Sequence, residues 1–118
     1  MSYRIAFSHT GDVLVATISG TCPKPDLLAR EIGTHARETA ARHLVIDMRR
    51  LLDRAGRLRE LFSHKSVPRR VAVIDSARNE RLYVFAELDA RRRGCTLRRF
   101  EDHESAVNWL LGSPSSGR

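Results

Sequence analysis

The chain has 118 residues, 42% of them apolar, and a formal net charge of +7 at pH 7. This size and composition are typical of one domain whose core needs neither a disulfide nor a metal, and the two cysteines lack the Cys-x-x-Cys spacing of a zinc or redox site. The N-terminus lacks the layout of a signal peptide, and the longest uncharged stretch, residues 13–23, is too short to cross a bilayer. We therefore expect a soluble, cytoplasmic domain with no membrane insertion.

The first two expected elements are strands. Tyr3, Ile5 and Phe7 alternate with residues of the opposite face, which is the period of two of a strand with one wet side. A turn at residues 9–12 precedes the β-rich, uncharged stretch 13–19. These patterns predict an antiparallel hairpin whose second strand is the more buried.

A helix is expected next, with Pro25 in its first turn, where the missing N–H has no intrahelical partner to lose. Leu28, Ile32, Ala36 and Ala40 then recur every four residues. This spacing predicts that one face of a helix running to Ala40 packs inward.

Two short apolar runs, residues 44–46 and 71–74, predict parallel strands that are buried on both faces. Each run is followed by an aspartate, Asp47 and Asp75. We interpret each carboxylate as an acceptor of local backbone N–H groups that turns the chain, although the ends of parallel strands are also where ligands bind. Residues 53–64 have helical spacing and predict the crossover helix between the two strands.

The last third of the chain predicts a helix, an edge strand and a final helix. Residues 79–93 end in three arginines and a glycine, which suit a helix C-terminus, and residues 95–100 carry arginines that discourage further strand pairing. Asp102 is expected to cap the final helix, in which Trp109 packs into the core. Residues 112–118 are rich in serine and glycine and are expected to form a disordered tail.

The expected order of elements is therefore β-β-α-β-α-β-α-β-α. Strands that alternate with helices require a mainly parallel sheet with right-handed crossovers. We predict a single α/β domain over residues 1–111, in which an N-terminal β-hairpin is followed by a mainly parallel sheet.

Local motifs for chemistry are missing from the sequence. No glycine-rich phosphate loop and no Gly-x-Ser-x-Gly elbow occurs, and the five histidines sit in different expected elements. This pattern predicts no catalytic residue, no metal site and no cofactor.

Clustered arginines supply most of the positive charge. Such a balance favours anionic partners, including nucleic acid, but a well-solvated arginine-rich surface explains the same composition. The clusters are Arg49-Arg50, Arg54-Arg57-Arg59, Arg69-Arg70, Arg91-Arg92-Arg93 and Arg98-Arg99.

Three short motifs occur in the same order as the expected elements. They are Leu44-Val45-Ile46-Asp47, Arg70-Val71-Ala72-Val73-Ile74, and Phe100-Glu101-Asp102 leading to Ala106-Val107-Asn108-Trp109-Leu110. Together they resemble the SpoIIAA-like family, the STAS and STAS/SEC14-type domains, over nearly all of residues 3–111. The resemblance implies a SpoIIAA-like β-α superhelix whose strands are laid down largely in sequence order.

The resemblance also has a functional consequence. Signalling members of that family carry Asp-Ser-Ser-Gly at the start of the helix after the central strand, where a serine is phosphorylated to release a partner. This sequence has Asp53-Arg54-Ala55-Gly56 in that place, and neither central residue has a hydroxyl. The resemblance therefore implies that a phosphoserine switch, which works by adding negative charge, is lacking.

Our first functional hypothesis is a non-enzymatic regulatory or binding domain that contacts a protein partner or a small ligand through residues 47–64. The residues predicted to make these contacts are Asp47, Arg49, Arg50, Asp53, Arg54 and His64.

Two alternatives stay open. An apolar or lipid-like molecule could bind in a SEC14-like pocket, if Leu51-Leu52 and Leu61-Phe62 face a groove instead of the core. Weak nucleic-acid binding through arginines ranks last, because the sequence lacks the aromatic pair of an RNA-recognition motif. A homodimer is expected if a helix leaves an apolar face exposed.

Overall fold

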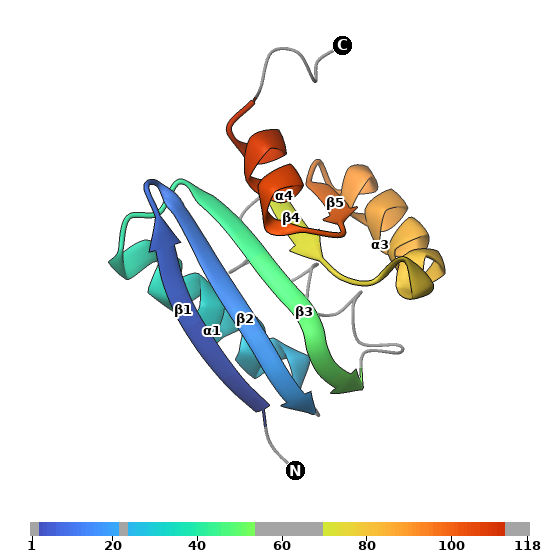
Figure 1. The fold of residues 1–118 in the computed structure, drawn as a ribbon, viewed down its shortest axis with the longest axis horizontal. Helices are drawn as coiled ribbons and strands as arrows, with labels where there is room; N and C mark the ends of the chain where they lie inside the picture. The colour runs from blue at the N-terminus through green and yellow to red at the C-terminus, as the bar shows by residue number, and fades with distance from the viewer. Residues whose placement is uncertain (1–2, 22–23, 54–69, 113–118) are drawn as a thin grey trace.

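The computed structural model describes residues 3–21, 24–53 and 70–112. These residues form one five-stranded sheet with the strand order β1-β2-β3-β4-β5 and three α-helices (Figure 1). The elements are β1 (Tyr3–Thr10), β2 (Val13–Thr21), α1 (Pro25–Glu38), β3 (His43–Asp53), β4 (Arg70–Ile74), the 3-10 turn η1 (Ala77–Asn79), α3 (Glu80–Arg92), β5 (Thr96–Phe100) and α4 (His103–Leu110).

The pairing of the strands confirms the predicted sheet. β1 pairs antiparallel with β2, whereas β2 with β3, β3 with β4 and β4 with β5 all pair parallel. The strands follow one another across the sheet in chain order, and β5 lies at an edge as predicted. Because the three parallel pairs run in one direction, the carboxyl ends of β2 to β5 lie at the same edge of the sheet.

The core is divided between the two faces of this sheet. Alternate residues such as Leu14 and Ile46 pack with Leu28 of α1 and Tyr83 of α3 on one face. On the other face, Val15, Val45, Ala72 and Ile74 pack with Ala106 and Leu110 of α4. α4 therefore lies across the sheet from α1 and α3, and Figure 1 shows α4 over β4.

The first helix begins as predicted but ends two residues early. It starts at Pro25 and ends at Glu38, and Ala40 lies outside it, exposed, with a φ of 56°. The N–H of Ala41 donates to the carbonyl of Ala36, and the N–H of Ala40 donates to that of Arg37. This is a Schellman ending, which requires a left-handed residue, so the prediction that Ala40 belongs to the buried helical series is wrong.

The central strand is longer than predicted. β3 continues through Asp47 to Asp53, so the prediction that Asp47 follows the end of its strand is wrong, and so is the placement of Asp53 in a helix. The rest of the predicted crossover helix, residues 54–64, lies outside the described residues.

The last helix is held at both ends by polar contacts. Asp102 accepts a hydrogen bond from the N–H of Ser105 at 2.8 Å, which confirms the predicted cap. The hydrogen bond from that backbone N–H lowers the pKa of Asp102 below 3.8. At the other end, Arg70 donates to the carbonyls of Trp109 and Leu110 at 2.7 and 3.2 Å and stacks over the Trp109 ring.

Trp109 packs against the core on the face of the sheet that α4 covers, as predicted, but it is only half-buried, between Arg70 and Phe100. Among the described helices none has the length and apolar character that crossing a bilayer requires. Of the predicted tail, only Gly112 lies within the described residues.

Candidate functional site

The central strand bulges where the candidate residues lie. Thr17 of β2 is paired with Asp47, but Ser19, two residues later, is paired with Arg50, so β3 has one extra residue at this point. A bulge of this kind twists a strand and re-aims its side chains, and such bulges are frequent beside functional sites. Asp47 and Arg49, two residues apart, lie on the side of the sheet that α4 covers, as alternate residues of a strand do, and the bulge begins directly after Asp47.

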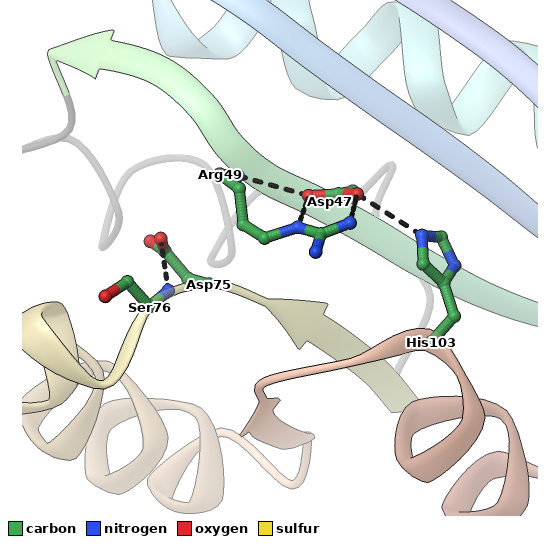
Figure 2. Close-up of polar contacts among 5 residues, drawn as sticks. All are labelled: Asp47, Arg49, Asp75, Ser76 and His103. Atoms are coloured by element: carbon green, nitrogen blue, oxygen red, sulfur yellow. Dashed lines mark hydrogen bonds and ion pairs between the residues drawn. The ribbon is translucent and has the colours of Figure 1, made fainter.

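Arg49 holds the Asp47 carboxylate through three hydrogen bonds (Figure 2). Its Nε donates to Oδ1 at 3.0 Å, its Nη2 donates to Oδ2 at 2.7 Å, and its backbone N–H donates to Oδ1 at 3.1 Å. The two side-chain bonds form a bidentate pair, which fixes the plane of the guanidinium. Asp47 therefore accepts a local N–H as predicted, but within a strand instead of at its end.

His103 approaches the same carboxylate from the start of α4. Its Nε2 lies 3.3 Å from Oδ2 of Asp47, and Figure 2 shows Asp47 between Arg49 and His103. The two residues are brought together because α4 begins just after the carboxyl end of β5, at the edge of the sheet where β3 and β4 also have their carboxyl ends. An imidazole and a guanidinium thus share one buried acid.

Opposing effects act on the charge of Asp47. Burial raises its pKa, but the hydrogen bonds from Arg49 and the charges of Arg49 and His103 together lower it by more. The net result is a pKa below 3.8. The side-chain hydrogen bond to Asp47 in turn raises the pKa of Arg49 above its ordinary value. Asp47 therefore stays ionised at neutral pH, and a carboxylate with such a low pKa is a poor general base.

The two partners of Asp47 reach solvent. The side chain of Asp47 is 6% exposed, whereas those of Arg49 and His103 are 46% and 48% exposed. Arg50, the next residue of the strand, is also exposed. A guanidinium has more N–H donors than the two that Asp47 receives, so the outer edge of Arg49 is free to donate outward.

A second buried aspartate lies close by, at the end of β4. Asp75 is 1% exposed, and its Oδ1 accepts the N–H of Ser76 at 2.7 Å (Figure 2) and Nδ2 of Asn79 at 3.1 Å. Its Oδ2 accepts the hydroxyl of Tyr83 at 2.7 Å. The prediction that Asp75 accepts a local backbone N–H is confirmed, while the contacts with Asn79 and Tyr83 on the α3 side were not foreseen.

The structure brings together only some of the predicted contact residues. Asp47 and Arg49 are in direct contact, and Arg50 follows them on the same strand. Asp53 is the last residue of β3, and Arg54 and His64 lie outside the described residues. His103 is not among the residues that the sequence predicted for this site. The available signal was its position directly after the Asp102 cap, at the start of a helix that follows a parallel strand.

Two other sequence predictions can be compared with the described residues. Of the apolar residues that would mark a lipid pocket, Leu51 is buried in the core and Leu52 is exposed, while Leu61-Phe62 lie outside the described residues. Within residues 3–21, 24–53 and 70–112, no three His, Cys, Asp or Glu side chains gather as a metal site requires.

Comparisons with known proteins bear on the fold. No family model and no curated protein matches the chain. A solved structure of an uncharacterised protein from Shewanella loihica PV-4, of the DUF3478 family with a SpoIIAA-like fold, is 23% identical and has a TM-score of 0.54. The match covers 92% of this chain and 93% of that one. The fold implied by the sequence motifs is thus confirmed, and the chain has a SpoIIAA-like α/β fold.

Proposed function

We propose that this protein is a non-enzymatic binding domain that receives a carboxylate of a protein partner or small ligand at the exposed edge of Arg49. The observation that carries the proposal is the bidentate pair with Asp47, which orients a half-exposed guanidinium. A guanidinium whose plane is already fixed loses less conformational entropy when it binds a planar anion.

The hydrogen-bonding inventory of this edge supports an acceptor-bearing ligand. The nearby acids already receive donors from their own chain: Asp47 from Arg49, Asp75 from Tyr83 and Asp102 from Ser105. Among the described residues, the outer edge of Arg49 and the side chain of Arg50 offer donors to solvent. Such an arrangement offers oriented donors to an anion.

The charge state of Asp47 supports a role in binding more than one in catalysis. Arg49 occupies both of its oxygens, and its pKa lies below 3.8, far from the pKa near neutrality that suits proton transfer. Arg54 and Ala55 also offer no hydroxyl for phosphorylation. Binding without a phosphoserine switch is the function that these features favour together.

A capture experiment tests the proposal. The full chain is immobilised and exposed to a lysate of the cells that make it, beside the double variant Arg49→Ala/Arg50→Ala. We expect recovery of the bound partner to fall by at least about tenfold in the variant, because a central interface arginine often carries more than 1.4 kcal/mol. The matched control is Arg30→Ala/Arg42→Ala, which removes two exposed arginines, one on α1 and one before β3. Failure to recover any partner, or equal recovery by both double variants, would contradict the proposal.

A further inference from the structure

α3 carries apolar side chains on the face that points away from the sheet. Its inward face is formed by Tyr83, Ala86 and Ala90, which are buried. Val84, Phe85 and Leu88 project to the opposite side, with exposed fractions of 46%, 74% and 46%. We call these three residues the α3 ridge.

The ridge is flanked by arginines at both ends. Arg81 lies one turn before it, and Arg91 and Arg92 lie one turn after it, all exposed. Among the described residues, the structure shows no ion pair for these three arginines.

The acids of α3 do not neutralise these arginines. Glu80 lies 3.8 Å from Arg99, and Glu87 accepts the backbone N–H of Arg99 at 3.3 Å. Asp89 pairs with Arg93 at 3.3 Å. Among the described residues, the contacts of these acids are thus with Arg93 and Arg99, and the outward face combines an apolar centre with positively charged ends.

We propose that the α3 ridge docks this protein onto an anionic membrane surface. The ridge would enter the boundary between headgroups and acyl chains, while the arginines at its two ends would contact lipid phosphates. Apolar residues on one face of a helix, bordered by arginines whose stems reach back to the headgroups, are typical of helices that lie in a membrane interface.

The charges argue against the other occupants. In an antiparallel pair of α3 helices from two copies, Arg81 of one copy would lie near Arg91 and Arg92 of the other, and like charges repel. A nucleic acid would satisfy the arginines but not the ridge, because phosphates do not bury apolar side chains.

A protein partner would need an apolar groove with acids at both ends. In an anionic bilayer, negatively charged headgroups surround any point at which a side chain enters the apolar interior. Such a surface can therefore receive the ridge and its arginines without a shaped groove. Figure 1 shows α3 at the outer side of the molecule beside β5, the edge strand, where a flat surface can approach it.

Vesicle sedimentation tests the proposal with the full chain. The probes are large vesicles of phosphatidylglycerol mixed equally with phosphatidylcholine, and vesicles of phosphatidylcholine alone, at about 0.1 M salt, where the Debye length is about 10 Å. We expect the protein to sediment with the anionic vesicles and to stay in solution with the neutral ones. Absence from the anionic pellet would overturn the proposal and leave an acidic protein helix or a second copy as the occupant.

Two sets of variants separate docking by the ridge from general attraction of charge. Phe85→Ser/Leu88→Ser should weaken partitioning by about tenfold or more, because two inserted side chains are lost. Arg81→Ala/Arg91→Ala/Arg92→Ala should weaken it by on the order of a hundredfold. The control Arg4→Ala/Arg30→Ala/Arg42→Ala removes the same charge elsewhere and should have a clearly smaller effect.

Unchanged partitioning of Phe85→Ser/Leu88→Ser, or equal losses for the two triple variants, would overturn the proposal. Phe85→Trp gives a readout that does not depend on affinity. Because Trp109 emits as well, the wild type is the reference: relative to it, the emission of Phe85→Trp should shift to shorter wavelength when the anionic vesicles are added. No such shift in sedimented protein would also overturn docking through the ridge.

Discussion

Two buried aspartates on neighbouring strands have opposite surroundings. Asp75 is 1% exposed, points toward α3 and, among the described residues, receives hydrogen bonds from Tyr83, Asn79 and Ser76. Asp47 points toward α4 and is held by Arg49 and His103, each about half exposed. The difference shows that similar apolar runs ending in aspartate produce one carboxylate that ties the fold together and another that orients a cation toward solvent.

The helices determine which role each aspartate has. α3 follows Asp75 closely in the chain, so its first turns supply neutral donors that close over the carboxylate. α4 begins with His103 and is only eight residues long, so it leaves the bulge of β3 partly uncovered. We therefore expect substitutions at Asp75 to affect folding, and substitutions at Asp47 to affect folding less and the presentation of Arg49 more.

The largest effect is expected for Asp75. Asp75→Ala removes a buried carboxylate that accepts hydrogen bonds from Tyr83, Asn79 and Ser76, which should lower the free energy of unfolding by about 3 kcal/mol. Tyr83→Phe removes one of those donors and should cost about 1–2 kcal/mol. Urea denaturation followed by circular dichroism measures both. A loss for Asp75→Ala no greater than that for Asp47→Asn would remove the distinction between the two sites.

A smaller effect is expected for Asp47. Asp47→Asn keeps the shape of the side chain but breaks the charged pair, and because Arg49 is half exposed the cost should be about 2 kcal/mol or less. Urea denaturation in low and high salt measures this cost and shows how far salt screens the charged pair. The double variant Asp47→Asn/Arg49→Ala should be less destabilised than the sum of the two single variants. Strict additivity would mean that the bidentate pair contributes no coupling.

The smallest effect concerns pH. The pKa of Asp47 is lowered in the folded protein below its ordinary value of 3.8, so its contribution to stability is present above pH 3.8. This contribution is lost as the pH falls from 3.8 through the lowered pKa. The stability difference between the wild type and Asp47→Asn should therefore shrink below about pH 4.

Asp102, whose pKa is also lowered, is present in both of these proteins, so it cancels in the comparison. Urea denaturation at a series of acid pH values measures the difference. A difference that stays constant down to about pH 2 would contradict the lowered pKa of Asp47.

Local patterns in the sequence were sufficient for much of the fold. Alternation in residues 3–7, the proline at the start of α1, the Asp102 cap and the two apolar runs each depend on neighbours within one turn or strand. Such signals predict elements and caps because the interactions they describe are local. The alternation of strands and helices predicted a mainly parallel sheet, whereas the order of its strands was implied by the resemblance to the SpoIIAA-like family.

The candidate site was only partly predictable, because it depends on distant contacts. The bulge that follows Asp47 arises from the register of β3 with β2, about thirty residues earlier, and no local residue signals it. His103 meets Asp47 only through the packing of α4 on the sheet. The outward direction of Phe85 also depends on which face of α3 meets the sheet, which helical spacing alone does not decide.

The most direct test of the proposed role of Arg49 is an NMR titration of the isotope-labelled full chain with a glutamate-rich peptide. We predict that the Nε–H signal of Arg49 and the backbone amide signals of Arg49 and Arg50 move in a saturable manner, and that Asp47→Asn weakens this response. If the signals of Arg30 and Arg42 move equally, or if the Arg49 signals do not move, the edge formed by β3 and α4 is not a binding site for carboxylates.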